Sequence, residues 1–419
     1  MRNSGVTNLS VWEVLGAGAI LLFLADISPA DMIVAERTAT SPPAFTSMVI
    51  FGDSLSDTGN IRLPDWLLGR ERSDGRFTSG PDTTPPGVAF GVWHEGLAGR
   101  LQLSPAGPSD LGGTNYAHGD ALTGLGTRNL GITDNVGEQV SDYLVSAGTS
   151  NGGVLHGIWA GGNDLIDAAD AVDSNPATRD SVSLLALEVP ARTAAANLKG
   201  YVVSLVVNTE AQYLIWPNLP ALDRIPHVQE GGSLGLPYTD ATKAALAYAV
   251  SVFNDEWNAA IADICATYPD VIIYGLDVHG AFACMLDDPA RYGYANVVDQ
   301  ACVEDSLPNA DVYLFWDGMH PTASAHQLLG AAAYNMILGI PDADFDGAVD
   351  MADYAIWFNH YGAGGLWSDG DFDGNSVVDM ADYAAWFNNY GYAGTGAVPE
   401  PATLSLLALG GLAMLRRRK

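Results

Sequence analysis

The chain has 419 residues, of which 48% are hydrophobic and 16% are charged, a composition typical of a globular protein. Its 18 basic and 49 acidic residues give a formal net charge of −31, and an acidic surface of this kind argues against a nucleic acid partner. The length allows one large domain with smaller segments attached to it.

The N-terminal stretch is organised like an export signal. A basic start precedes an apolar run from Val14 to Ala25, and a small-residue site follows at residues 28–30. This order predicts a signal peptide over residues 1–30, cleaved after Ala30, and therefore an exported protein. We interpret residues 31–45 as a linker.

A short apolar run, Met48–Phe51, leads into Gly52, Asp53 and Ser54. This pattern predicts a buried strand that enters a turn, so that Ser54 lies just past the carboxyl end of the strand. That edge of an open α/β sheet is where ligands bind, and a helix starting there points N–H groups at the same place. Ser54 is therefore a candidate nucleophile whose own N–H helps to hold an oxyanion. Alternatively, Asp53 and Ser54 only cap a helix.

A second apolar run, Val154–Ala160, also ends in glycines, and Asn163 follows them. A side-chain amide beside a glycine turn can approach a developing oxyanion at about 2.7–3.1 Å. Asn163 is therefore a candidate oxyanion donor. In the alternative interpretation, Asn163 and Asp164 cap the next helix.

Strands and helices alternate in the middle of the chain. Residues 211–216 and 271–276 predict buried strands, and residues 240–268 predict a long helix between them. One face of that helix is apolar at helical spacing, with Leu246, Val250, Phe253, Trp257, Ile261 and Ile264. This alternation predicts a parallel sheet with helices on both faces.

An apolar run over residues 312–316 leads into Asp317, and His320 stands three residues after that carboxylate. At this spacing the carboxylate can bind the imidazole Nδ1–H, which fixes the tautomer that leaves Nε2 free to accept a proton from a serine. Asp317 and His320 are therefore the candidate orienting acid and general base. His326 on the following helix is a rival base.

Three cysteines leave at least one thiol unpaired within the chain. Cys284 and Cys302 flank an irregular stretch, and in an exported protein they would form a loop-closing disulfide worth about 3 kcal/mol. Cys265 lies in an alanine-rich helical run and is interpreted as a small core residue.

These blocks, in this order, resemble those of the GDSL (SGNH) hydrolases, a family of lipases and esterases. The similar segments are FGDSLSDTGN at Ser54, GRFTSGP at residues 75–81, NYAHGDALTG at Gly119, GGND at Asn163, and DGMH at Asp317 and His320, continued by Pro321 and Thr322.

The resemblance implies a flavodoxin-like three-layer α/β/α sandwich over residues 46–339, with a catalytic triad of Ser54, His320 and Asp317 that needs no cofactor. It also implies an oxyanion hole formed by the N–H groups of Ser54 and Gly119 and the side chain of Asn163. The family often has a second glycine where this chain has Asp120. Alternatively, Gly119 only forms a turn.

Residues 342–353 have the ligand spacing of an EF-hand-like calcium loop, and the spacing returns from residue 371. Ten aspartates fall between Asp342 and Asp382. The doubled loop-helix unit is similar to type I dockerins, which implies a small helical module over residues 340–392 with structural Ca²⁺ and a cohesin-like or other surface partner. The predicted ligands are Asp342, Asp344, Asp346, Asp350, Asp353, Asp371, Asp373, Asn375, Asp379 and Asp382.

The C-terminus, residues 393–419, combines Pro-Glu-Pro, an apolar run and a basic end. The apolar run Ala402–Leu415 would span about 21 Å as a helix, less than the roughly 30 Å of a bilayer core. The whole segment resembles the PEP-CTERM sorting signal, which implies transient membrane association and processing by a sorting enzyme during export.

Three functions remain open at this stage. The first is a secreted serine hydrolase of carboxylic esters, of the lipase, phospholipase or esterase type. The second is a carbohydrate O-acetylesterase that acts on surface polysaccharide, and the third is a non-catalytic surface binding protein. All three fit a protein exported to the cell envelope or the medium.

Overall fold

The computed structural model describes residues 43–61, 75–80, 91–147, 153–231, 235–303, 310–375 and 377–393. The predicted signal peptide, most of the predicted linker and the sorting segment from residue 394 onward lie outside these ranges. No helix within the described ranges has both the length and the apolar character that crossing a membrane requires.

The central sheet of the described residues has four parallel strands in the order β1-β4-β5-β6. Their bounds are β1 (Ser47–Gly52), β4 (Val154–Trp159), β5 (Tyr213–Pro217) and β6 (Ile272–Leu276). β1 pairs with β4 along its whole length, from Ser47 opposite Val154 to Gly52 opposite Trp159. The residues that follow these two strands therefore meet at one edge of the sheet.

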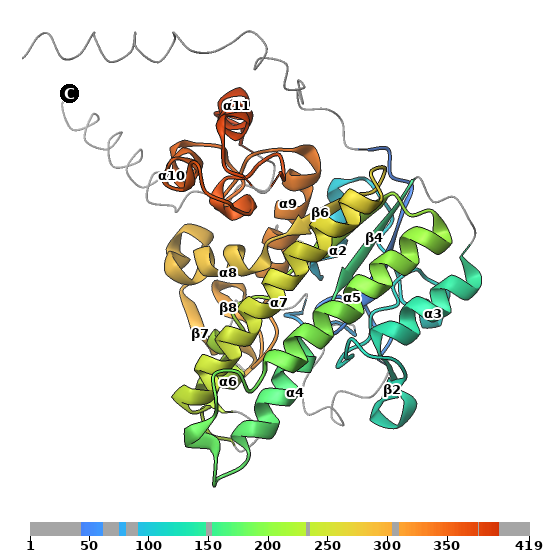
Figure 1. The fold of residues 1–419 in the computed structure, drawn as a ribbon, viewed down its shortest axis with the longest axis vertical. Helices are drawn as coiled ribbons and strands as arrows, with labels where there is room; N and C mark the ends of the chain where they lie inside the picture. The colour runs from blue at the N-terminus through green and yellow to red at the C-terminus, as the bar shows by residue number, and fades with distance from the viewer. Residues whose placement is uncertain are drawn as a thin grey trace, which may run out of the picture. The chain divides into compact units, whose positions relative to one another are not determined.

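Helices cover both faces of the sheet. Neighbouring residues of a strand point to opposite faces, and along β4 the Gly157 position faces Trp93 of α2, whereas His156 binds the hydroxyl of Tyr143 on α3. α5 and α7 lie side by side in Figure 1. The bounds of these helices and of α9 are α2 (Trp93–Arg100), α3 (Val136–Ser146), α5 (Glu188–Thr209), α7 (Asp240–Thr267) and α9 (Ala323–Leu338). The predicted α/β sandwich with a parallel sheet is confirmed.

Shorter elements connect these layers. α4 (Gly162–Asp173) follows β4 directly, and α8 (Val278–Asp287) follows β6. A small pair of parallel strands, β7 (Asn296–Gln300) and β8 (Tyr313–Phe315), precedes α9. The remaining elements are the antiparallel pair β2 (Thr127–Arg128) and β3 (Thr133–Asp134) and the short helix α6 (Pro226–Glu230).

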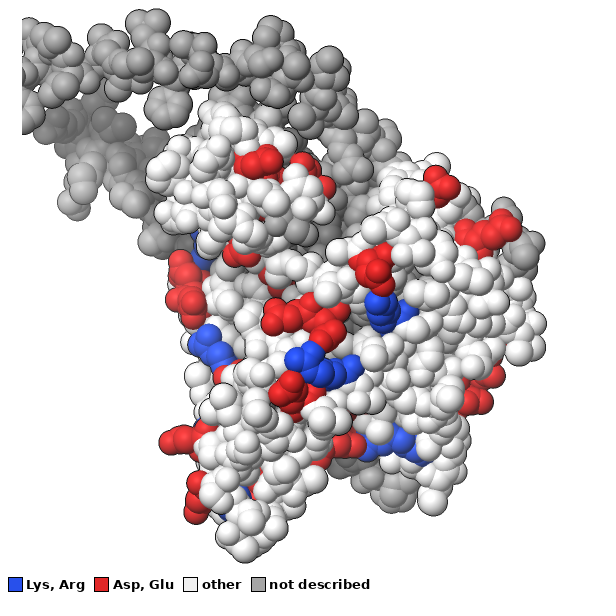
Figure 2. Space-filling view, in the orientation of Figure 1, with Lys and Arg blue, Asp and Glu red and all other residues white. Residues whose placement is uncertain are grey.

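The acidic composition is visible on the molecular surface. Figure 2 shows acidic side chains spread over the face that carries α5 and α7, with basic side chains beside several of them. Lys199 on α5 pairs with Asp263 on α7 at 2.6 Å, and Arg192 pairs with Glu256. The few basic groups on these two helices therefore join neighbouring elements.

The C-terminal helices α10 (Met351–His360) and α11 (Met380–Asn389) have an apolar core of their own. This core includes Ile340, Val349, Trp357, Phe372, Val378 and Trp386. The Trp357 indole N–H donates to the Asp379 carbonyl, and the Trp386 indole N–H donates to the Asp350 carbonyl. Each repeat thus inserts its tryptophan at the start of the other repeat's helix.

The structure does not join Cys284 to Cys302, contrary to the prediction. Cys284 is a free, partly buried thiol on α8, where burial and the charge of Asp344 raise its pKa to about 11. Cys302 lies beyond β7, where its N–H donates to the carbonyl of Trp316. The two cysteines therefore lie in different surroundings, and spacing along the chain was not enough to predict a bond between them.

Candidate active site

Ser54 lies immediately after β1, at the edge of the sheet where ligands bind. Gly52, at the end of this strand, has a φ of +150°, and a Cβ there would lie 2.2 Å from the carbonyl oxygen of Trp159. Only glycine therefore allows β1 and β4 to end so close together. The Asp53 N–H donates to the same carbonyl at 3.3 Å, which fixes the turn that presents Ser54.

Ser54 and His320 are brought together from opposite ends of the domain. The distance between Ser54 Oγ and His320 Nε2 is 2.7 Å, and both residues are buried. The predicted nucleophile and the predicted base are therefore at hydrogen-bond distance in the structure, the geometry that proton transfer from a serine requires.

Asp317 orients His320 from within the same turn. Its Oδ1 accepts the backbone N–H groups of Met319 at 2.7 Å and His320 at 2.9 Å. Its two oxygens lie 2.9 and 2.8 Å from His320 Nδ1. This carboxylate is therefore held by the backbone while it contacts the imidazole, which favours the tautomer with the proton on Nδ1.

His326, the rival base, lies elsewhere. It is fully buried on α9, where its Nδ1 accepts the backbone N–H of Trp93 at 3.3 Å. Burial and the neighbouring His320 lower its pKa to about 3. His326 is therefore neutral, connects α9 to α2, and does not act as the base for Ser54.

Asn163 stands in the first turn of α4, next to the Ser54 turn. Gly161 before it has a φ of +114°, a conformation that suits glycine. One Nδ2 hydrogen of Asn163 donates to the Ala121 carbonyl at 3.0 Å. Because an amide carries two N–H donors, this bond fixes the side chain and leaves a second hydrogen for a ligand.

The Gly119 N–H, predicted as an oxyanion donor, has a partner within the protein. It donates to Asp57 Oδ2 at 2.8 Å, and Asp57 also accepts the N–H groups of Gly59 and Asn60. The next residue, Asp120, has a φ of +68°, and its N–H has no hydrogen-bond partner among the described residues. The loop thus offers the N–H of Asp120, the residue that follows Gly119.

Phe77 is a site residue to which the sequence assigned no chemistry. Its ring lies 5.2 Å from the His320 ring, and a Cβ at Gly119 would lie 2.4 Å from it. The same short segment contacts the turn after His320, since Thr78 Oγ1 donates to the Pro321 carbonyl and Ser79 Oγ accepts the Ala323 N–H. The glycine-rich motif at residues 75–81 was the only signal in the sequence.

Two carboxylates surround the Ser54 turn without touching its hydroxyl. Burial raises the pKa of Asp53 to about 7, although the Leu55 N–H that it accepts acts in the opposite direction. Burial also raises the pKa of Asp57, against the same opposing effect from the N–H groups that it accepts. By accepting backbone N–H groups, these two carboxylates hold the main chain around Ser54 in place.

The predicted calcium ligands gather only in part. Carboxylate oxygens of Asp342, Asp344 and Asp353 lie within 4.8 Å of one another, and those of Asp371, Asp373 and Asp382 do the same. All of these residues except Asp373 are buried. Carboxylates at this spacing repel one another, and their oxygen atoms suit Ca²⁺. Of the other predicted ligands, Asp350 and Asp379 cap α10 and α11, Asp346 pairs with Arg291, and Asn375 bonds Asp373.

Two parts of the chain match known protein families. Residues 48–333 match the GDSL-like lipase/acylhydrolase family, and residues 397–419 match the PEP-CTERM protein-sorting motif. The chain is 24% identical over 367 residues to Lipase 1 of Photorhabdus luminescens, covering 72% of this chain and 52% of that protein. It therefore spans about half the length of this relative. A GDSL esterase/lipase of Arabidopsis thaliana is 24% identical over 350 residues, covering 73% of this chain and 94% of that protein.

Solved structures of similar fold include an extracellular lipase from Streptomyces rimosus, with a TM-score of 0.36 and 17% identity over 70% of this chain and 98% of that one. Another is phospholipase A1 from Streptomyces albidoflavus, with a TM-score of 0.35 and 17% identity over 70% of this chain and 98% of that one.

Proposed function

This chain belongs to the GDSL-like lipase/acylhydrolase family of carboxylic ester hydrolases, and we propose that Ser54, His320 and Asp317 carry out ester hydrolysis here by two-step acyl transfer. The observation that carries the proposal is the 2.7 Å distance between Ser54 Oγ and His320 Nε2, with Asp317 on the other ring nitrogen. No cofactor takes part in this mechanism.

In the first step His320 Nε2 takes the proton of Ser54, and the hydroxyl oxygen attacks the ester carbonyl carbon. Asp317 stabilises the imidazolium that forms. His320 then protonates the leaving alcohol as the carbon–oxygen bond breaks, which leaves an acyl group on Ser54. In the second step His320 takes a proton from water, and the hydroxide attacks the acyl carbon. The bond from that carbon to Ser54 Oγ then breaks, His320 returns the proton to Ser54 Oγ, and the free acid departs.

The oxyanion formed in each step needs donors that are not already used. The Ser54 N–H and the Asp120 N–H have no hydrogen-bond partner among the described residues, and the Asn163 amide has one hydrogen beyond its bond to Ala121. We therefore propose these three groups as the oxyanion hole. Gly119, which the sequence predicted as a donor, has a different role in this arrangement. Its N–H donates to Asp57 and so fixes the position of the loop.

A fluorophosphonate probe tests the proposal directly, because it modifies only a serine that is activated as a nucleophile. We expect one label per folded chain, and peptide mapping should place it on Ser54. Heat-denatured protein is the control and should remain unlabelled. Folded protein that takes no label, or takes it on another serine, would contradict the proposed nucleophile.

The PEP-CTERM motif at the C-terminus implies export and sorting to the cell envelope. We propose that a signal peptide over residues 1–30 directs this export, and that a sorting enzyme processes the segment over residues 393–419 after a transient membrane association. Both segments lie outside the described residues, apart from residue 393.

We also propose that residues 340–392 form a dockerin-like module with structural Ca²⁺. Two sets of three carboxylates, one in each repeat, support this proposal, and their oxygen donors fit the ion. The module exposes matching aromatic residues in its two repeats: Phe358 is 62% exposed and Phe387 is 63% exposed. This repeated surface is where we place the cohesin-like or other surface partner.

Removing calcium is expected to destabilise the module within the full-length protein. At a calcium concentration a hundred times the dissociation constant, binding to the native state adds about 2.7 kcal/mol per site to the free energy of unfolding. Thermal unfolding followed by tryptophan fluorescence, in Ca²⁺ and in EDTA, measures this difference, because Trp357 and Trp386 lie in the module core.

Asp342→Asn should reduce the difference between Ca²⁺ and EDTA, whereas Asp255→Asn, an exposed aspartate on α7, should leave it unchanged. Identical unfolding curves of the unmodified protein in Ca²⁺ and EDTA would show that the acidic loops do not bind the ion.

A further inference from the structure

Residues 118–122 form the loop that carries Asp120, one of the proposed oxyanion donors. Four of the five backbone N–H groups of this loop already have acceptors within the protein, which are oxygen atoms of Gly52, Asp57, His118 and Asn135. The fifth, the N–H of Asp120, has no hydrogen-bond partner among the described residues. The direction of this one N–H therefore decides whether the loop contributes to the oxyanion hole.

Residues 118–121 form a type II β-turn. The Ala121 N–H donates to the His118 carbonyl at 3.2 Å, and of the two central residues only Asp120 has a positive φ, +68°. Glycine is the usual residue at this third position, because a positive φ strains other residues. Flipping the peptide between Gly119 and Asp120 would give a type I turn without that strain, but the Gly119 carbonyl would then point where the Asp120 N–H points now.

Thr133 on β3 opposes this flip. Its hydroxyl donates to the Gly119 carbonyl at 3.2 Å, and Thr133 is buried. In a trans peptide the C=O and the N–H point in opposite directions, so a bond to the Gly119 carbonyl also sets the direction of the Asp120 N–H. Asn129 Nδ2 donates to Thr133 Oγ1 at 3.1 Å, which leaves the hydroxyl hydrogen for Gly119. A flipped peptide would break this buried hydrogen bond.

Arg128 on β2 holds the other side of Asp120. Its Nη1 donates to the Asp120 carbonyl at 2.8 Å and to Asp120 Oδ1 at 3.1 Å, and its Nη2 donates to Asp167 Oδ2 on α4 at 2.7 Å. A carboxylate next to a developing oxyanion opposes that charge, and the guanidinium offsets this repulsion. Strands β2 and β3 therefore hold both the backbone and the charge of Asp120.

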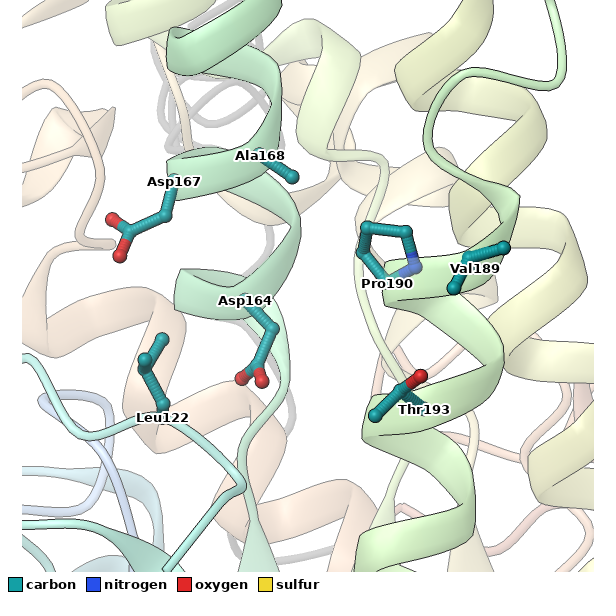
Figure 3. Close-up of a pocket in the computed structure, with 7 residues that line it drawn as sticks. All are labelled: Leu122, Asp164, Asp167, Ala168, Val189, Pro190 and Thr193. Atoms are coloured by element: carbon teal, nitrogen blue, oxygen red, sulfur yellow. The ribbon is translucent and has the colours of Figure 1, made fainter. Parts of the chain in front are cut away.

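The loop is also joined to α4, the helix that carries Asn163. Thr123, the residue after the loop, donates its backbone N–H and its hydroxyl to Asp164, at 3.0 and 2.8 Å. Figure 3 shows the carboxylates of Asp164 and Asp167 on the side of α4 that faces Leu122 of the loop. The loop and α4 therefore hold two of the proposed oxyanion donors on one connected frame.

We propose that Thr133 is a positioning residue of the oxyanion hole, because its hydroxyl holds the Gly119–Asp120 peptide in the orientation that presents the Asp120 N–H to the oxyanion. The inference rests on the proposed function, in which this N–H is a donor. Thr133 acts through the Gly119 carbonyl and not on the substrate itself. A residue of this kind affects the transition state more than the binding of the ester.

The test measures kcat and KM for a short-chain p-nitrophenyl ester. Thr133→Val keeps the branched shape of the side chain but removes the hydroxyl. We expect kcat to fall about tenfold and KM to change less than twofold, because a lost oxyanion donor costs on the order of 10²–10³-fold and this variant keeps the donor in place part of the time. Thr133→Ser, which keeps the hydroxyl, should retain at least half of kcat. Thr267→Val, the same substitution at the exposed last residue of α7, is the control and should change neither value.

Two further variants separate positioning from a general loss of structure. Asp120→Gly, added to Thr133→Val, favours the type II turn without help from the hydroxyl, so it should raise the kcat of that variant about threefold or more. Asn129→Asp changes an exposed residue and serves if Thr133→Val does not fold. A carboxylate at that position accepts the Thr133 hydroxyl in place of the Gly119 carbonyl, and we expect kcat to fall about threefold or more.

A folded Thr133→Val protein with kcat within twofold of the unmodified enzyme would overturn the assignment. An equal loss in Thr133→Ser, or no gain from Asp120→Gly, would overturn it too. Each of these results leaves the unmodified enzyme active and labelled on Ser54. Folded unmodified protein that neither hydrolyses the ester nor takes the fluorophosphonate label would instead remove the proposed function itself.

Discussion

Ser54→Ala is expected to lower kcat for a short-chain p-nitrophenyl ester by about 10⁴–10⁶-fold, because the acyl-enzyme can no longer form. The residual rate would come from ester that is bound and polarised by the remaining oxyanion donors. Stability should change little, because among the described residues the hydroxyl bonds only to His320 Nε2, and the Ser54 turn is held by the N–H and the carboxylate of Asp53.

The measurement pairs kcat with the thermal unfolding midpoint of the same preparation. Ser251→Ala, which removes an exposed serine hydroxyl on α7, is the matched control and should retain full activity. A folded Ser54→Ala protein that turns over the ester at the unmodified rate would show that another residue attacks the carbonyl.

Asp317→Asn is expected to lower kcat by about 10⁴-fold, because an amide in place of the carboxylate reverses the imidazole tautomer. The Oδ1 of Asp317 accepts two backbone N–H groups, so the oxygen of asparagine must stay on that side. Its NH₂ group would then face His320 Nδ1, where Oδ2 now lies at 2.8 Å. An N–H at that place forces the proton of the neutral ring onto Nε2, which can no longer accept the proton of Ser54.

This prediction is checked by kcat for the same ester, with the unfolding midpoint as the measure of folding. Asp255→Asn, an exposed substitution of the same type on α7, is the control and should leave kcat unchanged. A loss of less than tenfold in a folded Asp317→Asn protein would mean that the carboxylate does not select the tautomer.

The sequence was most informative where a feature depends on neighbouring residues. The apolar run that stops at Gly52, the helix of residues 240–267 and the three-residue spacing of Asp317 and His320 are all local patterns, and the structure contains each of them. The spacing of apolar residues shows which face of a strand or helix is buried. A carboxylate three residues before a histidine can contact the imidazole within a single turn of the chain.

Features that depend on contacts between distant segments were missed. Nothing near Gly119 indicates that its N–H donates to Asp57, since these two residues meet only after β1 and the loop pair across the domain. Phe77 likewise meets His320 through a contact between segments far apart in the chain. The incorrect pairing of Cys284 with Cys302 has the same origin, because closeness along the chain does not fix closeness in space.

Arg291, which precedes the C-terminal module, pairs with Asp344 and Asp346 of the first acidic loop at 2.7 and 2.6 Å. The hydroxyl of Tyr292 donates to the Asp344 carbonyl at 2.5 Å. Asp373, the counterpart of Asp344 in the second loop, is exposed. The two copies of the duplicated unit therefore differ: Arg291 and Tyr292 fasten the first acidic loop to the catalytic domain, whereas the second loop leaves Asp373 in contact with water.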